Sequence, residues 1–327
     1  MDKRNVAVAT VIALILLASG SFGTAFAQTY PVRPVRVVIG FAPGGSADIV
    51  PRVVAVELAK RLGQPWVIDN KPGAGGQIGV AAVLNAPADG YTLLSGALGM
   101  IAINPSLYKE LAYDPVRDLI PIASVARVPM VILVQRAGPA SVRDLIAESK
   151  AKPGKLNYGN SGIGTAMHLT AEMFKFATGA DLTPVAFRTS GEVTAALLGG
   201  FVDAICTDAN MALTTLRTGK VKAIVVSSQE RSPMLPDVPT MAESGYPSFE
   251  PMMGWFGFFA RAGTPPEIVN KLSAEIERVL QVPEVRERIL ATGSEPWYLP
   301  PAQFGLFVKA EIAKWDRAVR ESGAQAK

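Results

Sequence analysis

Residues 36 to 48 read Arg36-Val37-Val38-Ile39-Gly40-Phe41-Ala42-Pro43-Gly44-Gly45-Ser46-Ala47-Asp48. The first six residues form a short β-branched run closed by glycine, which predicts a buried strand. Val54, Leu58 and Leu62 then recur at a spacing of four, and Gly63 follows them. This pattern predicts a helix that ends at the glycine. A strand, a glycine-rich turn and a helix in this order form the first half of a βαβ unit.

The same alternation continues along the chain. Further strands are expected at residues 66–68, 91–94, 128–134, 155–158, 201–206 and 223–226. Helices are expected at residues 80–86, 141–150 and 194–198, after residue 165, and in two amphipathic segments near the C-terminus. Ser141 is expected to cap its helix, and Thr264-Pro265-Pro266-Glu267 predicts a capping box. Regular alternation predicts an α/β protein with doubly wound sheets and helices on both faces.

The first 27 residues have the pattern of a secretory signal. Lys3 and Arg4 precede an apolar run from residue 6 to 18, and Ala25-Phe26-Ala27 provides a small-x-small cleavage site. The apolar run is shorter than the roughly 20 residues that a membrane anchor needs. We therefore expect export to the periplasm with cleavage after Ala27.

Composition excludes several classes of function. The formal net charge is only +4, whereas a nucleic-acid-binding surface needs a clustered basic face. The chain has one Cys and one His, so a His/Cys zinc site, a redox pair and an internal disulfide would all need more of these residues. We expect no metal, no cofactor and no nucleic-acid partner. Cys206 lies in an expected strand and is interpreted as a buried apolar residue.

Two glycine-rich turns come close to known motifs but miss the spacing. In the stretch 73–79, Ile78 stands where a dinucleotide fingerprint requires glycine, so a structural turn is preferred. The stretch 159–163 ends in isoleucine where a nucleophile elbow requires glycine. His168 follows Ser161 on the same expected helix, whereas such hydrolases bring their base from far downstream. Packing near a helix start is preferred for His168, and a secreted serine hydrolase using Ser161 is the alternative function.

The turns at residues 44–46 and 161–165 each lead from an expected strand into a helix. The first N–H groups of a helix have no intrahelical acceptor, and the positive end of the helix dipole lies there. Glycine allows close approach of a ligand, and the hydroxyls of Ser46, Ser161 and Thr165 add donors. One such turn is equally well explained as a helix cap. Two similar turns, one in each half, favour a cleft that binds a small carboxylate.

A series of motifs extends in order over nearly all of residues 30–320. They are Tyr30-Pro31-Val32-Arg33-Pro34, residues 41–48, Asp69-Asn70-Lys71-Pro72-Gly73-Ala74-Gly75-Gly76, Asp89-Gly90-Tyr91-Thr92-Leu93-Leu94, Ala102-Ile103-Asn104-Pro105, residues 161–169, Leu235-Pro236-Asp237-Val238-Pro239-Thr240 and Trp255-Phe256-Gly257. Together they resemble the substrate-binding proteins of the tripartite tricarboxylate transporter, or Bug-type, family.

The resemblance implies a periplasmic binding protein of type II, not an enzyme, with two doubly wound α/β domains around a hinge. Domain 1 would comprise residues 28–127 and 253–327, and domain 2 residues 128–252. The protein would be a monomer that closes over a small organic carboxylate and delivers it to membrane permease subunits. An extracellular sensor would bind the same ligand. Mono- and dicarboxylates, aliphatic and aromatic, all remain open.

The resemblance also implies the residues that contact the ligand. In domain 1 they are Phe41, Ala42, Pro43, Gly45, Ser46, Asp48, Ser95, Gly96 and Ala97. In domain 2 they are Asn160, Ser161, Gly164, Thr165, His168, Thr189 and Asp208. Asp48 and Asp208 are also explained as helix caps. Arg188 is a counter-charge for a second carboxylate or, preferably, a solvated surface residue.

Overall fold

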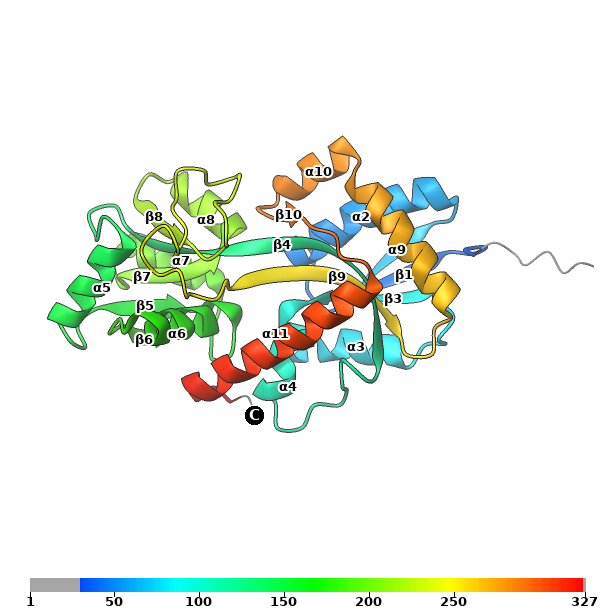
Figure 1. The fold of residues 1–327 in the computed structure, drawn as a ribbon, viewed down its shortest axis with the longest axis horizontal. Helices are drawn as coiled ribbons and strands as arrows, with labels where there is room; N and C mark the ends of the chain where they lie inside the picture. The colour runs from blue at the N-terminus through cyan, green and yellow to red at the C-terminus, as the bar shows by residue number, and fades with distance from the viewer. Residues whose placement is uncertain (1–29, 326–327) are drawn as a thin grey trace, which may run out of the picture. The chain divides into compact units, whose positions relative to one another are not determined.

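The computed structural model describes residues 30–325, in which strands and helices alternate around a mixed β-sheet (Figure 1). The predicted signal peptide and its cleavage site lie outside the described residues. Within the described part of the chain, no helix combines the length and the apolarity needed to cross a membrane. The α/β class expected from the alternation is confirmed.

The first half of the sheet is a parallel unit centred on its first strand. Its elements are β1 (Val35–Ile39), α2 (Ser46–Leu62), β2 (Trp66–Asn70), η2 (Ala74–Gly76), α3 (Gln77–Leu84) and β3 (Thr92–Ala97), followed by η3 (Gly99–Ile103) and α4 (Asn104–Leu107). β1 lies between β2 and β3 and is parallel to both. The chain moves from β1 through α2 to β2 in one direction across the sheet, and then from β2 through α3 to β3 in the opposite direction. Because such crossovers are right-handed, α2 and α3 lie on opposite faces of the sheet (Figure 1). Gly63 ends α2 at a φ of 67°, as predicted.

The second half repeats this arrangement with different residues. Its elements are α5 (Val142–Ala151), β5 (Asn157–Asn160), α6 (Ala166–Thr178), β6 (Thr183–Ala186), α7 (Ser190–Gly199), β7 (Ala204–Asp208), α8 (Ala209–Leu216) and β8 (Val221–Val226). β5 lies between β6 and β7 and is parallel to both. The turns that lead into α2 and α6 therefore occupy equivalent positions, each after the central strand of its half.

Two long strands run between these groups of elements (Figure 1). They are β4 (Leu119–Gln135) and β9 (Met253–Arg261). β4 is antiparallel to β9 from Leu119 to Pro129, and antiparallel to β7 from Met130 to Val134. The sheet order is therefore β2-β1-β3-β9-β4-β7-β5-β6, with β8 also paired to β4. The domain boundaries expected from the sequence fall inside β4 and at the start of β9.

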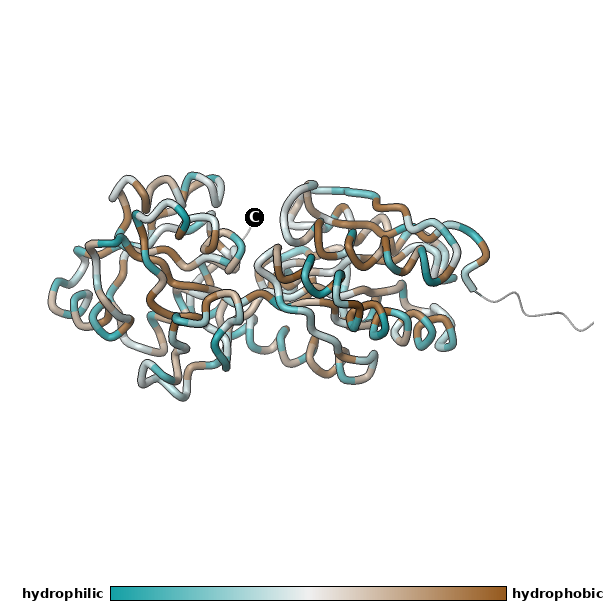
Figure 2. Tube along the Cα trace, turned by 90° about the horizontal axis from the view of Figure 1, so that it is seen from above, coloured by the Kyte–Doolittle hydropathy of each residue, from teal (hydrophilic) through white to brown (hydrophobic). Residues whose placement is uncertain are grey.

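The C-terminal segment returns to the first half and completes its core. It comprises α9 (Pro266–Leu280), α10 (Pro283–Leu290), β10 (Glu295–Pro296) and α11 (Pro301–Ser322). The ring of Phe304 lies 5.7 Å from Trp255 and 5.1 Å from Phe259, centroid to centroid. Hydrophobic segments follow the strands through the interior of both halves (Figure 2).

Several predicted details differ from the structure. The capping box at Thr264–Glu267 is wrong: Pro265 is the N-cap residue of α9, and the Thr264 hydroxyl donates to the Arg261 carbonyl at 2.8 Å. β4 begins at Leu119 rather than at residue 128. Prolines normally interrupt strands, but Pro121 lies at a register shift and Pro129 lies where the pairing passes from β9 to β7. Because β4 and β9 run antiparallel to their neighbours, the sheet is mixed.

Other element boundaries move by a few residues. α7 begins at Ser190 rather than at residue 194, since the Thr189 hydroxyl accepts from the Glu192 N–H at 3.2 Å and starts the helix there. α3 begins at Gln77 rather than at residue 80. β5 and β7 each extend to a polar residue, Asn160 and Asp208, beyond the predicted apolar runs. The Ser141 cap of α5 is confirmed, with the Asp144 N–H at 3.2 Å from its hydroxyl.

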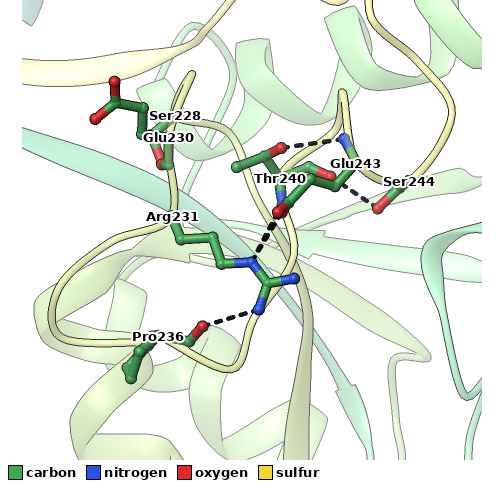
Figure 3. A network of polar contacts seen from close by, with 7 residues as sticks. All are labelled: Ser228, Glu230, Arg231, Pro236, Thr240, Glu243 and Ser244. Atoms are coloured by element: carbon green, nitrogen blue, oxygen red, sulfur yellow. Dashed lines mark hydrogen bonds and ion pairs between the residues drawn. The ribbon is translucent and has the colours of Figure 1, made fainter.

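The proline-rich segment between β8 and β9 is held by polar contacts (Figure 3). Arg231 Nε donates to both carboxylate oxygens of Glu243, at 3.0 and 2.9 Å, and Arg231 Nη1 donates to the Pro236 carbonyl at 3.0 Å. Glu243 and Thr240 each accept the other's backbone N–H, at 2.8 and 3.2 Å. These contacts give an ordered path to a segment that has little regular secondary structure.

Candidate functional site

A cavity of about 330 Å³ lies where strands from both halves end. Phe41 follows β1, Ala97 ends β3, Ser161 follows β5 and Asp208 ends β7, and all four line the cavity. In each half the chain leaves the central strand toward one neighbour and later returns to the other. The carboxyl ends of strands at such a reversal form the crevice in which α/β sheets bind ligands. Each half therefore contributes one such crevice, and the two crevices together form this cavity.

The lining combines many apolar residues with a few polar ones. The apolar and glycine residues are Phe41, Ala47, Ala97, Leu98, Gly99, Ile103, Val128, Met130, Gly164, Ala166, Met167, Gly254, Trp255 and Phe256. The polar residues are Ser46, Asn104, Ser161, Ser190 and Asp208. A concave, largely apolar site with few polar groups is typical of small-molecule binding.

Six of the sequence-predicted site residues line this cavity, and the other ten do not. Those that line it are Phe41, Ser46, Ala97, Ser161, Gly164 and Asp208. Ala42, Pro43 and Gly45 are exposed on the turn before α2, and Ser95 and Gly96 are buried within β3. Asp48, Asn160, Thr165, His168 and Thr189 instead hold the turns and helix starts through the contacts described below.

The start of α2 presents backbone donors without a side-chain acceptor. Gly45 is the N-cap residue and makes no side-chain capping bond. The N–H groups of Ser46 and Ala47 lie in the first turn, where helices provide no internal acceptor. Both residues line the cavity. The helix dipole adds partial positive charge at this end, so the start of α2 is suited to an anion.

Asp48 shapes the turn before α2. Its carboxylate accepts from the Gly44 N–H at 3.0 Å, from Arg52 Nε at 2.9 Å and from Asn70 Nδ2 at 2.8 Å. Asn70 Nδ2 also donates to the Phe41 carbonyl at 3.0 Å. Burial alone would raise the pKa of Asp48, but these bonds outweigh it and hold the pKa below its ordinary value. Asp48 therefore holds the turn as an ionised carboxylate, although it is not the N-cap residue of its helix.

The turn before α6 is held by its own side chains. Asn160 Oδ1 accepts from the Gly162 N–H at 3.0 Å. The Thr165 hydroxyl caps α6 by accepting from the His168 N–H at 3.3 Å, and it donates to the Gly162 carbonyl at 2.8 Å. Asn160 and Thr165 therefore fix the backbone that presents Ser161 to the cavity.

Ser161 and His168 have separate partners. The Ser161 hydroxyl donates to Met167 Sδ at 3.3 Å, whereas His168 Nδ1 accepts from the Gly164 N–H at 3.3 Å. His168 is buried, as its packing interpretation predicts. Burial lowers the pKa of His168, so its imidazole is neutral in the native protein at neutral pH. The geometry gives His168 a role in holding the turn at Gly164.

His168 is expected to make native stability fall as the pH drops below about 6.5, the ordinary pKa of an unfolded histidine. Below that pH the unfolded chain binds a proton that native His168 resists, since its folded pKa is lowered. The variant His168→Asn keeps an acceptor for the Gly164 N–H but does not titrate. Urea unfolding at about pH 7.5 and 5.5 measures the free energy of unfolding at each pH. This free energy should fall less between the two pH values for the variant than for the wild-type protein. The chain contains one histidine. An equal fall in the free energy of unfolding for both proteins would therefore contradict a lowered pKa of His168 in the native state.

Asp208 and Thr189 are N-caps, as the structure places them. Asp208 Oδ1 accepts from the Met211 N–H at 2.9 Å at the start of α8. Burial raises the pKa of Asp208 despite its backbone bonds.

Cys206 is buried, as predicted, and burial raises the pKa of its thiol. The Arg188 side chain is 91% exposed and pairs with Glu192, which confirms the surface interpretation.

Contacts between the two halves surround the cavity. Asn210 Nδ2, at the start of α8, donates to the Ser46 hydroxyl at 3.3 Å. Gly164 has a φ of 78°, and a Cβ there would meet Leu107 Cδ1 at 2.4 Å. Gly293 has a φ of 76°, and a Cβ there would lie 2.5 Å from the Asn210 backbone. These glycines allow the two halves to approach closely at these two points.

Sequence reasoning missed most of the apolar lining. Trp255 and Phe256 belong to a quoted motif, and so does Asn104, but none was assigned to the site. Val128 and Met130 line the cavity from β4. The extent of β4 was underestimated because prolines normally interrupt strands. Ser190 belongs to a helix start that was predicted too late. The prediction relied on the glycine-rich turns and their hydroxyl donors, so it did not reach the largely apolar wall that β4 and β9 contribute.

Comparisons with known proteins extend over nearly the whole chain. A family model described as a tripartite tricarboxylate transporter family receptor matches residues 50–324. Protein BugT of Bordetella pertussis is 38% identical over 319 residues, which cover 97% of this chain and 98% of BugT. The structure of R. palustris Rpa4515 with adipate has a TM-score of 0.79 and 34% identity, and covers 90% of this chain and 99% of its own. The structure of MatC from Rhodopseudomonas palustris with bound malate has a TM-score of 0.73 and 36% identity, and the match covers 89% of this chain and 100% of MatC.

Proposed function

The chain belongs to the tripartite tricarboxylate transporter receptor family, and from this premise we propose that it captures a small organic carboxylate in the periplasm. Members of this family are solute-binding receptors rather than enzymes, and they are periplasmic. Adipate and malate are the molecules bound to two of its relatives. The receptor would then present its carboxylate to the membrane permease subunits of a tripartite transporter.

The open start of α2 is the observation that carries this proposal. The N–H groups of Ser46 and Ala47 lack an intrahelical acceptor, and Gly45 provides no side chain to replace one. In the cavity that these residues line, the opposite half contributes Ser161 and Ser190. A carboxylate accepts up to about four hydrogen bonds. Hydrogen bonds to a charged group contribute roughly 1.5–3 kcal/mol each, so a few of them support micromolar binding.

Binding is coupled to closure of two lobes. Lobe 1 comprises residues 28–127 and 253–327, and lobe 2 comprises residues 128–252, with the hinge in β4 and at the start of β9. A carboxylate that touches α2 and the turn before α6 contacts both lobes only when they are shut. It therefore stabilises the closed state by its higher affinity for that state. The Asn210–Ser46 hydrogen bond adds a direct contact between the shut lobes.

Export and assembly complete the proposal. The mature receptor starts at Gln28, after cleavage that follows Ala27. It acts as a monomer, since lobe closure within one chain completes the site. Its partners are the ligand and the permease subunits, which recognise the shut receptor.

Thermal unfolding of the exported protein tests the proposal. A ligand that binds only the native state at 100 times its dissociation constant adds about 2.7 kcal/mol to the free energy of unfolding. We expect at least one member of a panel of mono-, di- and tricarboxylates to raise the melting temperature by several degrees. Neutral sugars serve as the control. A shift with sugars and none with carboxylates would overturn the proposal.

A further inference from the structure

We infer that the ligand is a monocarboxylate with an apolar body, and that the cavity excludes a second carboxylate. The inference rests on the proposed function, because it concerns the same cavity and narrows its ligand class. It follows from three features of the lining: its charge, its available donors and its apolar wall.

The charge of the lining opposes a dianion. Among the cavity-lining residues of the described chain, Asp208 alone carries a formal charge, and that charge is negative. Two arginines near the relevant turns are engaged elsewhere. Arg52 donates to Asp48 and Asn70, and the side chain of Arg188 is 91% exposed beside Glu192. A second carboxylate would thus meet an acidic side chain instead of a cation.

The polar donors suffice for one carboxylate. Asn104 Nδ2 already donates to the Gly75 carbonyl and the Tyr113 hydroxyl, at 3.0 and 3.2 Å. The Ser161 hydroxyl donates to Met167 Sδ. The caps of α6, α7 and α8 each occupy a first-turn N–H, whereas α2 has no such cap. The starts of α2 and α6 each keep two first-turn N–H groups without an intrahelical acceptor, those of Ser46 and Ala47 in α2 and those of Ala166 and Met167 in α6. A carboxylate accepts up to about four hydrogen bonds, so one carboxylate held between the two helix starts uses both pairs.

The rest of the cavity favours hydrocarbon. Val128 and Met130 come from β4, Trp255 and Phe256 from β9, and Met167 from α6. Thioether and aromatic side chains adapt to apolar ligands of varied shape. Each methylene that moves from water to such a wall improves affinity roughly fourfold. A charged group placed there would lose its hydration without gaining partners.

Matched pairs of acids separate the two ligand classes. Isothermal titration calorimetry of the exported protein would compare hexanoate with adipate, which has the same carbon chain and a second carboxylate, and benzoate with terephthalate. We expect each monocarboxylate to bind at least tenfold more tightly than its dicarboxylate partner. Affinity should also rise from butanoate to hexanoate by roughly fourfold per methylene.

The outcomes distinguish this inference from the proposed function. Adipate or terephthalate binding as tightly as its partner would overturn the monocarboxylate assignment while leaving a carboxylate receptor. Binding of no acid in either class would overturn the proposed function itself.

The variant Asp208→Asn tests how the second carboxylate is excluded. Asparagine caps helices as well as aspartate does, so α8 keeps its start. Removing the negative charge should improve adipate affinity more than hexanoate affinity and narrow the ratio between them. The exposed Asp237→Asn removes the same charge at a residue that does not line the cavity, and it should leave the ratio of the two affinities unchanged. An unaltered ratio in Asp208→Asn would overturn the role of Asp208.

Discussion

Replacing Ser46 with proline is expected to weaken carboxylate binding roughly 10- to 150-fold relative to Ser46→Ala. This factor corresponds to one hydrogen bond to a charged group, about 1.5–3 kcal/mol. Ser46 is the first residue of α2, where proline fits best and where its missing N–H costs the helix nothing. Gly45 before it is extended, with φ −86° and ψ 171°, which is the conformation that proline requires of its predecessor.

The alanine variant makes the comparison specific to the backbone. Both variants lose the hydroxyl that accepts from Asn210, so any effect of that contact cancels between them. Calorimetry with the tightest-binding carboxylate measures the difference, and circular dichroism and the melting temperature check that α2 is intact. Equal affinities for the two variants would show that the N–H at residue 46 does not hold the ligand.

The position of the cavity was predictable because it depends on local signals. Glycine-rich turns after apolar runs mark the points where strands pass into helices, and Gly44–Ser46 and Ser161–Thr165 were identified on this basis. Chain reversal in each half then brings the carboxyl ends of β1, β3, β5 and β7 toward one cavity. Patterns of a few residues therefore carried information about a cavity that two distant segments line.

The roles of single residues were less predictable, because they depend on tertiary partners. Asp48 and Asn160 have the polarity expected of ligand contacts, yet their side chains hold backbone turns. Thr165 and Thr189 cap helices. The apolar wall needed the course of β4, whose prolines are tolerated only because of its register shift and change of partner. Such features follow from neighbours that the local sequence does not specify.

Replacing Glu311 with leucine is expected to lower the free energy of unfolding by about 3–5 kcal/mol, the usual cost of breaking a buried charge pair. Glu311 is 5% exposed on α11, and its Oε2 accepts from the indole Nε1 of both Trp255 and Trp315 at 3.0 Å. It also pairs with Lys314, whose side chain is 10% exposed. Leucine would leave two buried indole donors without an acceptor, and it would leave the Lys314 ammonium without its counter-charge, with the Pro251 carbonyl at 3.0 Å as its remaining acceptor.

Urea unfolding followed by tryptophan fluorescence measures this loss, and the exposed Glu321→Leu on the same helix is the control. Glu311→Gln keeps an acceptor for the indoles and should lose less. The double variant Glu311→Leu/Lys314→Met should recover part of the loss, because it no longer leaves a buried charge unpaired. A loss below about 1 kcal/mol for Glu311→Leu would contradict the proposed pairing.

The same variant should also weaken carboxylate binding, because Trp255 lines the cavity and its indole donates to Glu311 on α11.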